Sequence, residues 1–354
     1  MIASLLTYAK RLATRPSVLV VGVLLLVSLG VFLPLLQSPA GTDMVNVADF
    51  LMDTFVTIRV PAVQRSAADA AMAEMKRLNR IFDRFDAGSE VSRVNAGAGN
   101  WVAVGPEMME LLSIVNEMAA EWTGDLFDVT VGPLMDVWGF GQDQQTVRPA
   151  PDDIQRALSL VDRSRLKLDW TGSRVMLSEP GMGLNLGGVA IGYAIDQAVG
   201  VLREHGVTSG LIEVGGDVYV IGQRPGGGAW RIGVQHPRQP GIKLGVLHLE
   251  EQAVATSGDY QRYFIVDGQR YHHILNPQTG YPSQGVISVT VVGPTATEVD
   301  ILSTAVFLLS AEEGIALLES MPGVEGIIVN AEEEVFVTSG LKKGEGTPRF
   351  EIRQ

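Results

Sequence analysis

Two oxygen-bearing side chains late in the chain have a spacing that would let them bind one ion. Asp300 and Thr304 lie four residues apart in an apolar segment, with Glu298 just before them. On a helix this spacing places both side chains on one face, where a carboxylate and a hydroxyl can share a hard cation such as Mg²⁺. A plainer interpretation is also open, in which Asp300 only adds a favourable charge to the first turn of a helix.

A pair of adjacent histidines forms a second candidate. His272 and His273 precede the turn-forming run Asn276-Pro277-Gln278-Thr279-Gly280. A histidine before a turn can act as a general base near neutral pH, and neighbours on a strand point to opposite faces. Zinc ligation is disfavoured, because the chain has five histidines, no HExxH motif and no cysteine. A purely structural role for the histidines stays open.

Glycine groups and aromatic residues beside acids complete the candidates. Gly187-Gly188 precedes a predicted helix that contains Gly192, and Gly215-Gly216-Asp217 follows a strand. Main chain close to a phosphate, with free N–H groups at a helix start, makes an anion site, although the spacing fits neither GxGxxG nor the phosphate loop. The stretches that begin at Phe85-Asp86 and Phe127-Asp128 could sandwich a flat heterocycle. Turns and ordinary core aromatics are the simpler explanations.

The composition limits the classes of protein that the chain can belong to. It has 354 residues, of which 46% are apolar and 19% charged, which is typical of a folded globular protein with one large domain or two. The net charge is −13 and no basic stripe occurs in the globular part, so nucleic acid is not an expected partner. The lack of cysteine excludes disulfides, thiolate metal sites and a cysteine nucleophile.

Residues 1–40 differ from the rest of the chain. Three basic residues precede an apolar run over 18–36 that is about long enough to cross a bilayer. We expect a membrane anchor whose basic flank stays in the cytoplasm, so that residues 41–354 form one domain facing the periplasm or the cell exterior. A cleaved signal peptide is the alternative, with the small residues at 38–40 as the cleavage site.

The hydrophobic pattern of residues 41–354 predicts an α+β fold. Strands occur in runs typical of antiparallel sheets, with helices between them, rather than in strict alternation. Ser66 is expected to cap the first helix of this part. The predicted helices cover 68–85, a segment starting at 106, 152–161, 190–205, 297–309 and 311–320. The predicted strands cover 55–60, a hairpin at 165–177, 210–222, 230–234, 243–249, 261–266, 286–292, 326–329 and 335–337.

Taken together, the motifs resemble those of the ApbE family of FAD:protein FMN transferases, in the family's order and over about residues 52–337. The matching segments are Met52-Asp53-Thr54, Ser89-Glu90-Val91-Ser92-Arg93, Phe127-Asp128-Val129-Thr130-Val131-Gly132-Pro133-Leu134, Leu186-Gly187-Gly188-Val189-Ala190-Ile191-Gly192-Tyr193, Gly215-Gly216-Asp217, Thr256-Ser257-Gly258-Asp259-Tyr260, His272-His273-Ile274-Leu275-Asn276-Pro277-Gln278-Thr279-Gly280 and Asp300-Ile301-Leu302-Ser303-Thr304-Ala305.

The resemblance implies a bilobed α+β fold, antiparallel sheets flanked by helices, with FAD in a cleft and Mg²⁺ on its pyrophosphate. Asp300, the Thr304 hydroxyl and a carbonyl near Gly188 would bind the metal, and His273 and Asp300 would be the catalytic residues. The implied FAD-binding residues are Met52, Phe85, Leu126, Phe127, Asp128, Asn185, Ile191 and His273.

The implied reaction transfers FMN to a threonine or serine hydroxyl of another protein and releases AMP. The family's acceptors are subunits of membrane redox complexes of the Rnf, Nqr or nitrous-oxide-reductase accessory type, with a Ser/Thr-Gly-Ala-Thr-like segment. Asp53 replaces the family's glycine, and Asn185 stands where many members carry aspartate. Two alternatives remain: hydrolysis of FAD to FMN and AMP at the same metal site, and a non-catalytic flavin-binding assembly protein.

Overall fold

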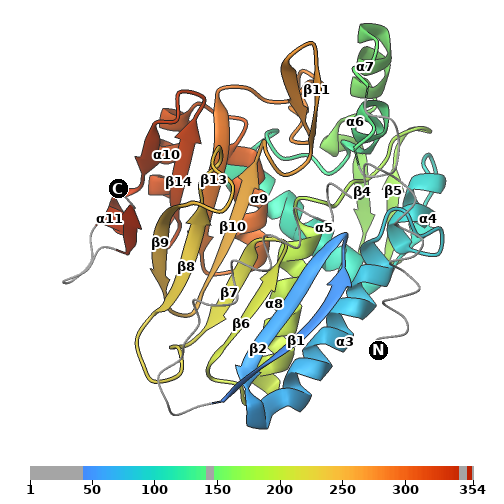
Figure 1. Ribbon diagram of the computed structural model, residues 1–354. Helices are drawn as coiled ribbons and strands as arrows, with labels where there is room; N and C mark the ends of the chain where they lie inside the picture. Colours follow the sequence, from blue (N-terminus) through green and yellow to red (C-terminus); the bar gives the residue numbers. More distant parts are fainter. Residues whose placement is uncertain (1–42, 141–146, 343–348, 353–354) are drawn as a thin grey trace, which may run out of the picture.

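The computed structural model describes residues 43–140, 147–342 and 349–352, and an antiparallel sheet of eight strands organises them (Figure 1). Every neighbouring pair of strands in this sheet is antiparallel. The strands lie in the order β1 (Met44–Leu51), β2 (Thr54–Pro61), β6 (Gly210–Val214), β7 (Asp217–Ile221), β10 (Gln252–Gly258), β13 (Val286–Gly293), β14 (Glu325–Asn330) and β15 (Val335–Val337).

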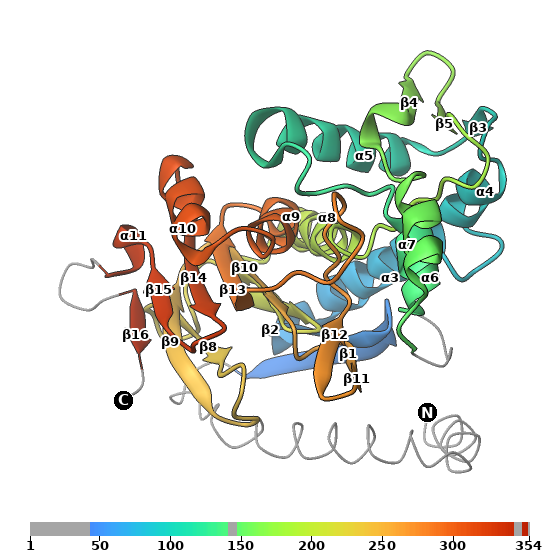
Figure 2. The ribbon, with the colours of Figure 1, turned by 90° about the horizontal axis from the view of Figure 1, so that it is seen from above.

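Helices cover one face of the sheet. The covering helices are α3 (Arg65–Phe82), α8 (Ala190–Glu204), α9 (Ala296–Val306) and α10 (Ala311–Ser320). Figure 2 shows them on the same side of the strands, with α8 between α3 and α9. Their apolar stripes bury Met75, Leu78, Ile195 and Leu302 against sheet residues such as Val289. The helical period of the sequence thus produces the main core.

A second, three-stranded sheet covers the other face at the end of β10, β13 and β14. It consists of β16 (Phe350–Ile352), β9 (Lys243–Leu249) and β8 (Trp230–Gln235). Trp230 and Leu247 pack there against Val254 and Ile287. With both faces covered, all eight residues of β13 are buried, whereas β2 alternates between buried and more accessible residues.

A smaller group of elements lies beside the main sheet (Figure 2). Its members are α4 (Glu90–Ala96), β3 (Val102–Ala103), α5 (Pro106–Met118), the π-helical segment Ala119–Thr123, α6 (Gly132–Trp138), α7 (Pro151–Leu158), β4 (Leu166–Asp169) and β5 (Arg174–Leu177). A two-stranded hairpin, β11 (Tyr263–Val266) and β12 (Gln269–His272), packs on α6. Short helical turns occur at Ala62–Gln64, Arg163–Arg165 and Ser339–Lys342.

The α+β prediction with antiparallel sheets is confirmed. The Ser66 cap was wrong: α3 begins at Arg65, directly after the helical turn Ala62–Gln64, and Gln64 is its cap residue. The predicted strand over 210–222 is a hairpin of β6 and β7, which turns at the glycines between them. The anchor predicted for residues 1–40 lies outside the described residues. Within 43–140, 147–342 and 349–352, no helix has the length and apolarity that crossing a bilayer requires.

The β1–β2 hairpin turns at Met52 and Asp53, which both have positive φ angles of 53° and 59°. A two-residue turn of this hand suits glycine best, and a side chain there is strained. We expect Asp53→Gly to raise the free energy of unfolding by about 0.5–1 kcal/mol, after subtracting the larger freedom of glycine in the unfolded chain. Chemical denaturation measures this.

The control for this prediction is Asp69→Gly, in the exposed face of α3, which should lower the free energy of unfolding by about 1 kcal/mol. An Asp53→Gly variant that is no more stable than the parent would show that the turn carries no backbone strain.

Candidate active site

The position of α9 is set by two residues of α8. Asp196 accepts hydrogen bonds from the N–H groups of Ala296 and Thr297, both at 2.8 Å, and from the Thr297 hydroxyl at 2.6 Å. The N–H of Gly192 donates to Oδ2 of Asp300 at 3.0 Å. A carboxylate at the first turn stabilises the helix start. The pair of helices therefore holds the Asp300 carboxylate in a fixed place.

Gly192 also allows the two helices to touch through their main chains. A Cβ added there would lie 2.3 Å from the carbonyl oxygen of Ala296. We expect Gly192→Ala to lower the free energy of unfolding by about 1–3 kcal/mol, since α9 has to move away. Because that movement also displaces Asp300, the variant should bind divalent cations more weakly in calorimetric titration.

A matched control for this variant is Gly200→Ala in the same helix, where a Cβ would meet no atom within 4 Å. It should be as stable as the parent or more stable, because alanine is the better helix former. Equal stability of the two variants would contradict the close approach of α8 and α9.

Asp300 faces a second carboxyl group, that of the half-buried Asp217. The Asp300 side chain is buried, with 7% of its surface exposed, and burial together with the negative charge of Asp217 raises its pKa well above the usual range. Burial likewise raises the pKa of Asp217, at the start of β7, to about 7, although the N–H of Thr256 donates to it at 3.1 Å. Each of the two carboxyl groups disfavours the ionised form of the other, because no positive charge among the described residues balances them. A bound cation would supply that charge.

Further oxygen atoms adjoin the same helix. A Cβ built on Gly188 would lie 3.2 Å from the Thr304 hydroxyl and 3.0 Å from the ring of Phe127. The Thr304 hydroxyl is also 3.4 Å from that of Ser257, which is 2.9 Å from the hydroxyl of Ser303. The glycine loop before α8, the last turns of α9 and the end of β10 therefore meet at one point.

These oxygen atoms fit a hard cation such as Mg²⁺ as its ligands. The described part of the chain holds no group of three histidine, cysteine or acidic side chains suited to a metal ion. The set consists instead of a carboxylate, hydroxyls and nearby main chain, all oxygen. Mg²⁺ is commonly held by one or two carboxylates and completes its shell with water and substrate phosphates.

The two histidines have different roles. Nε2 of His272 lies 2.8 Å from the carbonyl oxygen of Ser283, and its Nδ1 accepts from the N–H of Ile274 at 3.3 Å. Both ring nitrogens are therefore used inside the protein. The ring also contacts Phe307, which ends α9, with centroids 5.5 Å apart. His272 thus fixes the hairpin to the helix that carries Asp300.

Within the described residues, Nε2 of His273 has no hydrogen-bond partner. Its Nδ1 lies 3.2 Å from the carbonyl oxygen of Arg262, which can only accept, so the proton is on Nδ1 and the lone pair on Nε2. Burial, and then the positive charge of Arg262, lower the pKa of His273 to about 3. The ring is therefore neutral near pH 7 and can accept a hydrogen bond or a proton at Nε2.

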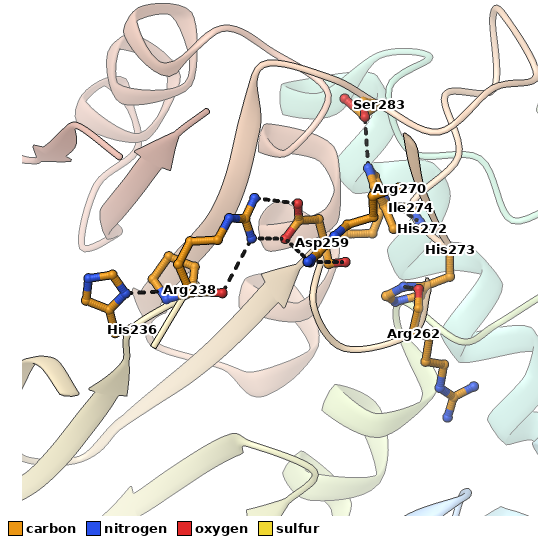
Figure 3. A network of polar contacts seen from close by, with 10 residues as sticks. His236, Arg238, Asp259, Arg262, Arg270, His272, His273, Ile274 and Ser283 are labelled. Atoms are coloured by element: carbon orange, nitrogen blue, oxygen red, sulfur yellow. Dashed lines mark hydrogen bonds and ion pairs between the residues drawn. The ribbon is translucent and has the colours of Figure 1, made fainter. Parts of the chain in front are cut away.

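An arginine pair that the sequence analysis missed stabilises the region around the histidines (Figure 3). Asp259, 6% exposed, accepts from both terminal nitrogens of Arg238 at 2.7 and 2.8 Å, and from Arg270 at 3.3 Å. Arg238 lies between β8 and β9, and Arg270 in β12. No spacing rule reveals these partners, which come from three separate segments. The only signal for this site in the sequence was the acidic residue Asp259 within the Thr-Ser-Gly-Asp-Tyr motif.

Two of the polar residues expected at the flavin are engaged in local structure. Oδ1 of Asp128 accepts from the N–H and the hydroxyl of Thr130, both at 2.7 Å, and its Oδ2 accepts from the N–H of Arg163 at 2.9 Å. Asn185 accepts from the N–H of Gly187 at 2.9 Å. Both side chains thus shape the loops next to Phe127 and Gly188.

Apart from His273, the remaining residues expected at the flavin are apolar. Met52 lies in the β1–β2 turn, where its N–H donates to Asn79 at 3.0 Å. Phe85 is 39% exposed, and the guanidinium of Arg84 lies 5.3 Å from the centre of its ring. Leu126 and Ile191 are half-buried. A partly exposed aromatic ring near a loop is suited to stacking on a heterocycle.

The geometry agrees with the comparisons with known proteins, among which a model described as the ApbE family matches residues 52–328. The chain belongs to the ApbE family. A FAD:protein FMN transferase of Klebsiella pneumoniae is 33% identical over 293 residues, which cover 82% of this chain and 90% of that protein. Its counterpart in Treponema pallidum is 30% identical and covers 83% and 86%. The resemblance stated from the motifs is confirmed.

Solved structures of ApbE proteins have the same fold. The ApbE protein of Thermotoga maritima superposes with a TM-score of 0.80 at 36% identity, covering 85% of this chain and 98% of that one. The apo flavinyl transferase ApbE of Pseudomonas stutzeri gives a TM-score of 0.75 at 29% identity, covering 86% and 98%. The described residues therefore have the fold of these ApbE structures.

Proposed function

We propose that this ApbE-family chain transfers FMN from FAD to a threonine or serine hydroxyl of another protein, with Mg²⁺ bound and AMP released. The observation that supports the proposal most is that the Thr304 hydroxyl and the ring of Phe127 adjoin the glycine loop at Gly188, while Asp300, one helical turn before Thr304, accepts from Gly192 in the helix that follows this loop. Oxygen ligands and an aromatic surface side by side suit a diphosphate joined to a flavin. The close relatives are named for this activity.

Each residue has a part in the proposed chemistry. Asp300, the Thr304 hydroxyl and main chain near Gly188 would hold Mg²⁺, which when bound neutralises charge on the pyrophosphate. Met52, Phe85, Leu126, Phe127, Asp128, Asn185, Ile191 and His273 would line the FAD site. Asp128 and Asn185 contribute mainly by shaping its loops, because their side-chain oxygens already accept hydrogen bonds.

The transfer itself needs a base and an aligned nucleophile. The acceptor hydroxyl donates its proton to Nε2 of His273 while its oxygen attacks the FMN phosphorus. The bond from that phosphorus to the bridging oxygen breaks, and AMP leaves with this oxygen. The anionic phosphates of FAD raise the pKa of the imidazole above its value in the free protein, which makes His273 a better base once substrate is bound.

The test combines the purified chain, FAD, Mg²⁺ and the soluble domain of a candidate acceptor that carries a Ser/Thr-Gly-Ala-Thr-like segment. Mass spectrometry should find one covalently added FMN on the acceptor, and a chelator should prevent the addition. Free FMN with unmodified acceptor would instead support the FAD-hydrolysing alternative. FAD that stays bound and intact with Mg²⁺ would support a flavin-binding assembly protein.

The setting of the reaction is part of the proposal. The basic flank and apolar run within residues 1–40 support an anchor in the cytoplasmic membrane, with the domain on the periplasmic or exterior side. A subunit of a membrane redox complex would then meet the enzyme at the same surface. Fractionation of cells that express the full chain, followed by protease treatment of intact spheroplasts, tests both points.

A further inference from the structure

The β11–β12 hairpin is held to the protein through one of its faces. Phe264 and Tyr271 pair across the strands with ring centroids 5.5 Å apart, and both pack against Trp138 at the end of α6. The Trp138 indole N–H donates to the carbonyl of Gly280 at 2.8 Å. A two-stranded hairpin is marginal alone, and this aromatic packing makes it rigid.

The opposite face of the hairpin carries apolar side chains that pack against little. Because side chains alternate along a strand, Tyr263 and Ile265 point away from the aromatic cluster. They are 42% and 60% exposed. Arg270, paired with Ile265 across the strands, lies 4.0 Å from the centre of the Tyr263 ring and is held by Asp259. We call Tyr263, Ile265 and Arg270 the open face; the exposed Arg262 directly precedes it in the chain.

The open face is continuous with the candidate base. The N–H of His273 donates to the carbonyl of Arg262 at 3.1 Å, and its Nδ1–H donates to the same oxygen at 3.2 Å. Arg262, whose carbonyl oxygen fixes the His273 ring, is directly followed by Tyr263, the first residue of β11. An acceptor protein that docks along this hairpin would therefore lie next to His273.

The charges of the open face differ from those of the whole chain. The chain carries a net charge of −13, whereas Arg262 and Arg270 flank Tyr263 and Ile265. An ordered arginine beside an aromatic ring and an exposed isoleucine is the composition of an interface centre, and such pre-ordering lowers the entropy cost of binding. The complementary partner is an apolar segment with a neighbouring carboxylate.

We propose that the open face of the β11–β12 hairpin docks the acceptor protein, through an apolar segment of that protein with an acidic side chain beside it. This inference rests on the proposed transfer function. Docking at this face brings the acceptor hydroxyl to His273, and it uses no residue of the cation site or of the flavin-lining set. Acceptor affinity and FAD binding are therefore separable.

The test measures transfer to the same acceptor domain with Ile265→Asp and Tyr263→Asp. Each variant should raise the KM for the acceptor at least about tenfold, while kcat at saturation and the affinity for FAD, followed by flavin fluorescence, stay within about twofold. The matched control is Val63→Asp. Val63 is 93% exposed and lies beyond the end of β2 opposite to the Met52–Asp53 turn, so its variant should keep the parent's KM.

A photo-reactive benzoylphenylalanine at position 265 gives an independent readout. It should cross-link to the acceptor domain, and the same residue at position 63 should not. A parent-like KM in both hairpin variants, or cross-linking only to a second copy of this chain, would overturn the docking assignment. If the parent protein transfers no FMN but position 265 still captures the acceptor, the transfer function fails while the docking face stands.

Discussion

Asp300→Asn is expected to reduce FMN transfer at least about a thousandfold and to abolish detectable Mg²⁺ binding. Asp300 is the proposed carboxylate ligand on α9, and the charge stabilisation that a bound metal would supply amounts to several kcal/mol, with each 1.36 kcal/mol worth a factor of ten. Asparagine keeps the shape and can still accept from the N–H of Gly192. Covalent flavin on the acceptor and calorimetric titration of Mg²⁺ give the two measurements.

The same substitution should stabilise the metal-free protein at pH 8. The pKa of Asp300 is higher in the folded chain than in the unfolded chain, so its contribution to stability is present below about pH 4 and is lost as the pH rises. An asparagine side chain cannot ionise, so the variant should unfold at higher denaturant concentration than the parent at pH 8 without Mg²⁺, and the difference should shrink toward pH 4. An Asp300→Asn variant with parental transfer would remove the metal assignment.

His273→Ala should lower kcat for transfer by about 10²–10⁴-fold, the range for loss of a positioned base. Its Nε2 is the only ring nitrogen of the histidine pair without a protein partner in the described residues. The affinity for Mg²⁺ should be unchanged, since no imidazole contributes to the oxygen set around Asp300. Single-turnover transfer with FAD and acceptor both saturating separates the chemical step from binding.

The matched control is His272→Gln, at the neighbouring residue. Loss of its bonds to Ser283 and Ile274 should lower the free energy of unfolding by about 1–3 kcal/mol, and the protein that remains folded should still transfer FMN. If His272→Gln instead reduces kcat as strongly as His273→Ala, the assignment of the base to His273 is wrong.

Local patterns of the sequence predicted much of the fold but little of its assembly. The helices over 190–205 and 311–320 and the strand over 243–249 carry periodic apolar residues, and the structure has them within a residue of those bounds. β1 and β10 were missed, because their runs mix small and polar residues with the apolar ones. Their strand conformation is decided by neighbours in the sheet, which no short window contains.

The candidate site shows the same division. The four-residue spacing of Asp300 and Thr304 was evident, because one helix sets it. The proximity of Asp217 to Asp300 was not evident, since β7 and α9 meet only in the folded chain. The glycines at 215 and 216 form a hairpin turn, which was the simpler explanation open for them. Long-range contacts therefore supply the part of the site that single motifs do not.

The hydrogen bonds that Asp196 accepts from the start of α9 join residues about one hundred positions apart. The entropy lost in closing so long a loop grows only logarithmically with its length, and the buried core rather than the site offsets it. A chain that stops before α9 has the glycine loop and Phe127 in its sequence but lacks Asp300 and Thr304, the proposed metal ligands. Under the proposed function, a nascent or truncated chain that lacks α9 therefore cannot consume FAD.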